Sequence, residues 1–210
     1  MLDSMLTRAT ARHRGVALTL CVLLGSAALG CGDDDEGSTS AVCEGDDCSC
    51  EQSGACVCDV AEQSEAAEDC KATCVATCSL SCVDKAKCQV KGDVPVTVDC
   101  NDDAQCKVEG DDDPIGAGSS IICSESSDCN FKAGANSIAT CTNAAHCKLD
   151  LGNGSRVRCR DSADCDIKCD GDCEVECGPG AACTVECGAI DAGSPAFECD
   201  DGRFLCGEEC

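Results

Sequence analysis

Residues 141–158 read CTNAAHCKLDLGNGSRVR and residues 159–176 read CRDSADCDIKCDGDCEVE, so two consecutive stretches share a cysteine pair spaced C-x5-C. The first cysteines of such pairs, starting at Cys82 and ending at Cys199, follow one another after 18, 23, 18, 18, 18 and 22 residues. A fixed period of this length is typical of a repeat architecture, in which stacked units share one core. The six pairs are Cys82/Cys88, Cys100/Cys106, Cys123/Cys129, Cys141/Cys147, Cys159/Cys165 and Cys177/Cys183.

The positions between the cysteines keep the same character from repeat to repeat. With each first cysteine as position 0, position 4 is small and position 8 is apolar in every repeat. An apolar residue also stands two positions before the next first cysteine, and Phe197 is the last of this series. Alternation of this kind indicates strands with one buried face, and the intervening Asn, Asp and Gly residues favour turns. We therefore predict an all-β fold, a disulfide-stapled parallel β-solenoid of 18-residue coils.

The spacing also predicts how the repeat cysteines pair. Positions 0 and 6 both point inward from strands that flank one tight turn, so their Cα atoms come within the ~4.4–6.8 Å that a disulfide requires. We expect a cross-link inside each coil. The alternative is a string of separate disulfide-knotted modules, but such modules have no need to keep their apolar positions in register across the linking turns.

The C-x5-C staple resembles that of the disulfide-bonded β-helical antifreeze proteins of insects. The resemblance covers the staple and the coil, and it implies a stacked β-helix. Their ice-binding face is a ladder of paired threonines, whereas the outward positions here change from Thr97 and Asp99 to Arg156 and Arg158. The ice-binding function therefore does not carry over.

The amino terminus has the layout of an export signal. A basic region around Arg12 precedes the nearly uncharged run 15–30, which is short for a bilayer span. The run ends in Ala28-Leu29-Gly30-Cys31, which resembles the lipobox of bacterial lipoproteins. The resemblance implies cleavage before Cys31 and a diacylglycerol on its thiol. An ordinary signal peptide cut after Ala28 is the alternative.

The number of cysteines favours the lipid-carrying form. The chain has 28 cysteines, and loss of Cys21 with the signal and of Cys31 to the lipid leaves 26, an even number. An ordinary cut leaves 27, and unpaired leftovers are uncommon in secreted disulfide proteins.

These features divide the chain into five parts. We predict a lipoprotein signal peptide at 1–30, an acidic tether at 31–42 and an irregular Cys-rich cap at 43–63. Solenoid repeats follow at 64–198, beginning with a degenerate coil in which Ser64 takes the position of the first cysteine. The segment 199–210 is expected to block the open strand edge at the far end.

Composition limits the partners. The chain carries 15 Lys or Arg and 40 Asp or Glu, and residues 1–30 hold three Arg and one Asp, so 12 basic and 39 acidic residues remain after export. So acidic a surface repels nucleic acid. Trp and Tyr are absent and Phe occurs three times, so disulfides must replace a conventional core, and they form in an oxidising compartment.

Catalytic and metal chemistry find little support. His146 is the one histidine of the exported part and stands at an outward position, so we interpret it as a solvated surface residue. No C-x2-C motif exists, which argues against zinc or copper clusters. The alternating carboxylates Asp170, Asp172, Glu174 and Glu176 are weak candidates for Ca²⁺. The alternative is that Arg156 and Arg158, one coil away, neutralise Glu174 and Glu176.

These observations predict a non-enzymatic, lipid-anchored structural or protein-binding surface protein of the bacterial cell envelope, with no cofactor. We favour the outer membrane as its location and expect a protein or envelope partner. Two alternatives stay open, an envelope protein that binds Ca²⁺ or another metal, and a small disulfide-module inhibitor or toxin-like protein.

Overall fold

The computed structural model describes residues 41–44, 48–50, 55–59, 69–110, 114–188, 194–207 and 210. The signal peptide at 1–30, the lipidation site Cys31, the tether up to residue 40 and Ser64 therefore lie outside the described residues. Within the described part, no helix is long and apolar enough to cross a bilayer.

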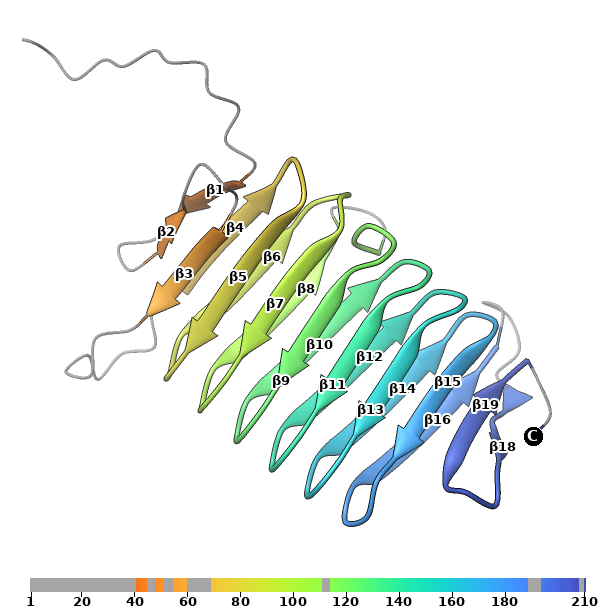
Figure 1. Ribbon diagram of the computed structural model, residues 1–210. Helices are drawn as coiled ribbons and strands as arrows, with labels where there is room; N and C mark the ends of the chain where they lie inside the picture. Colours follow the sequence, from red (N-terminus) through yellow and green to blue (C-terminus); the bar gives the residue numbers. More distant parts are fainter. Residues whose placement is uncertain are drawn as a thin grey trace, which may run out of the picture. The chain divides into compact units, whose positions relative to one another are not determined.

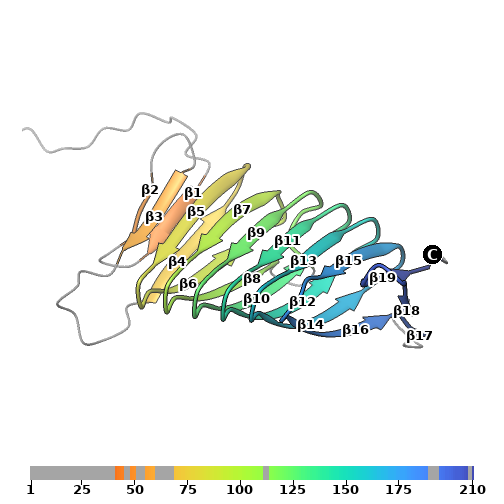
Figure 2. The same ribbon diagram turned by 60° about the horizontal axis from the view of Figure 1, so that its bottom comes forward.

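The strands form two sheets that face each other along the stack of coils (Figures 1 and 2). Sheet A contains, in spatial order, β1 (Ala41–Glu44), β4 (Asp69–Cys74), β6 (Lys87–Lys91), β8 (Gln105–Glu109), β10 (Asp128–Ala133), β12 (His146–Leu151), β14 (Asp164–Cys169), β16 (Ala182–Cys187) and β17 (Ser194–Pro195). Sheet B contains β18 (Phe197–Glu198), β19 (Arg203–Cys206), β15 (Cys173–Cys177), β13 (Arg156–Cys159), β11 (Ile138–Cys141), β9 (Ser120–Cys123), β7 (Val96–Cys100), β5 (Cys78–Val83), β3 (Ala55–Asp59) and β2 (Cys48–Cys50).

The predicted parallel β-solenoid is confirmed. Each coil contributes one strand to each sheet, and strands of successive coils pair in parallel with cysteine opposite cysteine, as in Cys129 and Cys147 of sheet A or Cys141 and Cys159 of sheet B. This continuous pairing contradicts the string of separate modules, because every described coil from β5 to β16 shares its backbone hydrogen bonds with its neighbours.

The core is filled by the predicted inward columns and by two further columns. Positions 0, 4, 6 and 8 are buried through the middle of the stack, where Phe131 is the largest fully buried side chain. Position 10 also points inward, as in Ala133 and Leu151, and so does the position four residues before each first cysteine, as in Ser137 and Ser155. The buried positions leave outward side chains only on the two flat sheet faces and the turns.

The tight turn between positions 0 and 6 has one recurring backbone feature. The residue at position 2 has a positive φ, between 58° and 61°, in five successive coils, at Asp84, Asp102, Glu125, Asn143 and Asp161. Asp and Asn tolerate this left-handed conformation better than most other residues, which explains their frequency there.

The N-terminal end is more regular than the irregular cap we predicted. β1 pairs antiparallel with β4, β2 pairs antiparallel with β3, and β3 joins sheet B in parallel with β5. The register places Cys58 opposite Cys82, so Cys58 and not Ser64 occupies position 0 of the first coil. Counting back 18 residues missed this because the turn between Cys58 and Cys70 is longer than in the other coils.

The C-terminal end reverses the strand direction. β17 pairs antiparallel with β16, and β19 pairs antiparallel with β15 and with β18. The expected block of the strand edge is therefore present, but it starts before residue 199; we call residues 194–210 the C-terminal cap. The reversal also makes the inward assignment of Phe197 wrong, because its side chain is 51% exposed.

Candidate functional site: the sulfur ladder, the sheet faces and the cap

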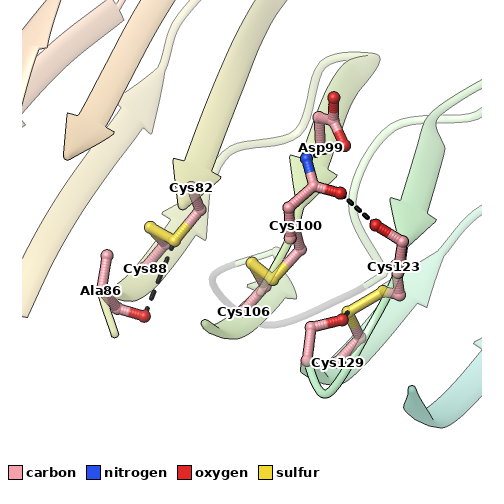
Figure 3. The surroundings of a disulfide bond; sticks show 11 residues. Cys82, Ala86, Cys88, Asp99, Cys100, Cys106, Cys123 and Cys129 are labelled. Carbon is pink, nitrogen blue, oxygen red and sulfur yellow. Dashed lines mark hydrogen bonds between the residues drawn. A yellow bond between two sulfur atoms is a disulfide. The ribbon is translucent and has the colours of Figure 1, made fainter. Parts of the chain in front are cut away.

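The sulfur ladder runs along the turn between positions 0 and 6 (Figure 3). The structure joins Cys82–Cys88, Cys100–Cys106, Cys123–Cys129, Cys141–Cys147, Cys159–Cys165 and Cys177–Cys183, with Cα–Cα distances of 6.4 to 6.7 Å. The predicted in-coil geometry is thus formed in all six coils.

Neighbouring bonds in this ladder stack closely. The Sγ atoms of Cys82, Cys88 and Cys106 lie within 4.8 Å of one another, and three similar groups follow along the stack. Such clusters resemble thiolate metal sites in spacing, but each sulfur belongs to a disulfide and offers no thiolate. The ladder is therefore a structural element of the described coils.

The weak Ca²⁺ candidates do not form one cluster of available carboxylates. Glu174 lies opposite Arg156 in the register, with 3.5 Å between Nε and Oε2, and it also accepts a hydrogen bond from Arg203 at 3.0 Å. Glu176 pairs with Arg158 at 3.2 Å and with Arg160 at 2.9 Å. The alternative that arginines neutralise these glutamates describes the structure, while Asp170 and Asp172 stand in the turn before β15.

His146 lies where the sequence placed it, on the outward face of sheet A. Its side chain is exposed, and Nδ1 is 3.5 Å from Oδ2 of Asp164 on the next coil. Ser127 is buried in the core at position 4 of another coil and faces away from this surface. The arrangement offers a surface ion pair rather than a nucleophile with its base.

The lysines segregate onto one face, a feature that the sequence analysis did not isolate. All eight lysines of the chain lie in described segments, and seven fall on strands of sheet A, with Lys85 in a turn as the exception. The described arginines lie instead on sheet B or its adjoining turn. The outward period of two along each coil carries this signal, and it becomes visible once both sheets are assigned.

A hollow lies on this lysine face. It measures about 420 Å³ and spans β4, β6, β8 and β10, with Lys71, Lys87, Lys107, Gln89, Gln105 and Asn130 among the residues around it. Lys107 is paired with Glu109 at 2.7 Å. We had expected no hollow of this size, since the inward positions are filled; the core is indeed filled, and the space lies between side chains that stand on the outer face.

The turns carry an acidic column. Glu125 and Asp102 occupy the same turn position in adjacent coils and share a side-chain hydrogen bond. This bond and the charge of Asp102 raise the pKa of Glu125. The two carboxyl groups therefore hold a proton more readily than separate ones would.

Two cysteines of the described part carry free thiols, and the sequence analysis did not single them out. Cys169 at the end of β14 and Cys173 at the start of β15 are both buried and are hydrogen-bonded to each other. Cys74 and Cys78 stand at the same two coil positions, with the same three-residue turn, and form a disulfide with a Cα–Cα distance of 6.0 Å. The shared C-x3-C spacing was the available signal.

The fold and its cross-links define the class of this protein as a cysteine-rich, disulfide-stapled parallel β-solenoid. Comparison with protein-family models, curated proteins and solved structures finds no match. Function therefore has to be argued from the residues themselves.

Proposed function

We propose that this chain is a lipid-anchored protein of the bacterial cell envelope that acts as a structural or protein-binding surface and not as an enzyme. The concentration of lysines on the outward face of sheet A carries the binding part of the proposal. In so acidic a chain, one face that presents Lys71, Lys87 and Lys107 around a hollow favours an acidic segment of a partner protein.

Rigidity supports a role as a scaffold. Each coil is closed by its own disulfide and hydrogen-bonded to both neighbours, so the outward side chains stand at fixed spacings of about 4.8 Å along the stack. A preordered surface loses little conformational entropy when a partner docks on it.

The anchor is proposed from the sequence alone. The basic region, the apolar run and the lipobox-like end at Cys31 coincide with an even count of remaining cysteines. Replacement by Cys31→Ser should move the protein from the membrane fraction of the producing cell to the soluble exported fraction. A mature terminus at another residue, without lipid, would contradict the anchor.

The binding face is tested with a photo-activated cross-linker. Placed at Gln105 inside the hollow, the cross-linker should capture an envelope protein in intact cells, and the K71Q/K87Q variant should lose that adduct because two cations are removed. The matched control K148Q/K168Q changes the same sheet farther along and should keep it. Equal capture from Thr97 on sheet B, or capture that ignores both lysine variants, would contradict the proposed face.

The calcium-binding alternative makes the opposite prediction for stability. If disulfides hold the fold, a reductant should unfold it and a chelator should leave its melting temperature unchanged. Unfolding by a chelator alone under oxidising conditions would replace the proposal by the metal-binding alternative, with Asp170 and Asp172 as the first residues to change.

A further inference from the structure

The two free thiols lie beside the one disulfide that joins the C-terminal cap to the coils. Cys187 at the end of β16 is bonded to Cys206 in β19, with a Cα–Cα distance of 5.3 Å. The other cap disulfide in the described part, Cys199–Cys210, lies wholly within the cap. Covalent attachment of the cap, apart from the chain itself, thus depends on Cys187–Cys206 among the described residues.

The register aligns the thiols with the two ends of that bond. Cys169 lies opposite Cys187 in the parallel pair of β14 and β16, and Cys173 lies opposite Cys206 in the antiparallel pair of β15 and β19. All four side chains are buried on the inward side. Directly opposed residues in paired strands have Cα atoms about 4.5–5.5 Å apart, which is within the range of a disulfide.

The surroundings distinguish the two thiols. Cys173 accepts hydrogen bonds from the Cys169 thiol and from the backbone N–H of Ser155, and these lower the pKa of Cys173. The same contact between the thiols raises the pKa of Cys169 far above its ordinary value, and burial raises it further. Since the thiolate is the attacking species, Cys173 is the better nucleophile of the pair.

A surface hollow reaches both reacting partners. A depression of about 260 Å³ is lined by Cys173 and Cys206, with Arg156, Arg203 and Glu174 around it. The depression gives solvent a path to the thiol and to the disulfide sulfur that lies opposite it.

We propose that Cys169, Cys173 and the Cys187–Cys206 bond form a thiol–disulfide exchange centre that releases and reattaches the C-terminal cap. The Cys173 thiolate attacks Sγ of Cys206; the Cys173–Cys206 bond forms, the Cys187–Cys206 bond breaks, and Cys187 leaves as a thiolate. Cys169 gives its proton to Cys187 and attacks Cys173; the Cys169–Cys173 bond forms, and Cys206 leaves and takes up the proton first lost from Cys173. Two thiols and one disulfide are present before and after, so no external oxidant is needed.

The product state fits the fold. The Cys169–Cys173 bond would close the same turn that Cys74–Cys78 closes in the first coil, across an equal number of residues. The exchange is independent of the proposed envelope function, because it needs only the four cysteines and their register.

Two variants test the centre, and each introduces a residue that already occupies the same column in a nearby coil. Cys169→Ala copies Ala133 and removes the resolving thiol, whereas Cys173→Ser copies Ser155 and removes the attacking thiol. Circular dichroism checks that both variants keep the β-fold.

The readout is acid quenching after incubation at pH 8, alkylation of free thiols and peptide mapping under non-reducing conditions. In the wild type, alkylation should divide between Cys169/Cys173 and Cys187/Cys206. C169A should accumulate the Cys173–Cys206 mixed disulfide with Cys187 alkylated, while C173S should keep Cys187–Cys206 and show an alkylated Cys169.

Three results would overturn the proposal. The first is a wild-type protein in which both pairs are fully oxidised and no thiol exchanges. The second is C169A with Cys187–Cys206 unchanged and a free Cys173. The third, a Cys169–Cys187 cross-link in C173S, would show that the attacking thiol is assigned to the wrong residue.

Discussion

A column of buried serines shows how single residues satisfy the backbone in this fold. Ser155 is 1% exposed, and its hydroxyl donates to the carbonyl of Gly152 at 2.6 Å while accepting the N–H of Ser137 at 3.1 Å. Ser119 repeats the arrangement with Gly116 and Val96. A hydroxyl at this inward position thus links one coil to the preceding one.

We predict that Ser155→Ala destabilises the folded chain by about 1–3 kcal/mol, because it leaves the buried N–H of Ser137 and the carbonyl of Gly152 without this partner. Denaturant unfolding monitored by circular dichroism measures the change. The control Ser162→Ala alters an exposed turn residue and should be close to neutral. Equal stability of the two variants would show that the serine column contributes nothing.

The carboxyl pair of Glu125 and Asp102 predicts a pH dependence. Because the fold raises the pKa of Glu125, the native chain binds more protons than the unfolded chain just above the ordinary value of 4.5, so stability falls as pH rises through this interval. Glu125→Asn removes one charge and places at φ 61° a residue that Asn143 already shows there at 60°.

Glu125→Asn should therefore raise the melting temperature at pH 7 and give a smaller gain at pH 3, where both carboxyl groups are protonated. The control Asp161→Asn changes the same turn position beside Arg160, where no such carboxyl pair is relieved, and should give no gain at pH 7. A Glu125→Asn variant that gains more at pH 3 than at pH 7 would contradict the proton-sharing pair.

Inward residues could be predicted from the sequence where their chemistry was unambiguous. Cysteine, alanine and branched aliphatic side chains at alternate positions indicated one buried face, and they are buried in the middle coils. The serine column escaped prediction because a hydroxyl alternating with charged residues carries no hydrophobic signal. Its burial depends on backbone groups of the adjacent coil, and a periodicity within one coil does not describe them.

At the scale of elements, the coil is the unit of the structure. Cys141 to Arg158 forms one complete coil with its own disulfide, and its strands contact those of the coils before and after it. In repeat proteins, stability is approximately a sum over units and their interfaces. A whole coil is therefore removable in principle, whereas part of a coil is not.

We predict that deletion of residues 141–158 yields a folded, shorter solenoid, because Thr140 is then followed by Cys159 and every strand keeps its facing. Deletion of residues 141–149 removes the same two cysteines but shifts the following strands out of register. Protease resistance and circular dichroism should show a stable core for the first deletion and its loss for the second. Loss of the core in both would contradict the coil as an independent unit.

Elements with the full period were predictable, and elements at the ends were not. A spacing of 18 residues places both strands of each central coil. At the N-terminal end, the same spacing chose Ser64, because an enlarged turn separates Cys58 from Cys70. At the C-terminal end, strand direction depends on the path of the chain after Cys187, and a list of alternating residues does not contain that direction.

At the scale of the whole molecule, charge is distributed by sheet. Lysines occupy the outward face of sheet A, arginines pair with glutamates on sheet B, and carboxylates gather in the turns. Composition alone indicated a uniformly acidic surface. The face that we propose for binding emerged only from the strand assignment, since net charge says nothing about where charges lie.

The central claim is that each coil is closed by its own disulfide and that these bonds hold the solenoid together. Peptide mapping by mass spectrometry of the full chain, digested without reduction, tests it most directly. The account predicts cross-links Cys100–Cys106, Cys123–Cys129, Cys141–Cys147 and their three equivalents. A map in which these cysteines are joined mainly to cysteines of neighbouring coils would contradict it.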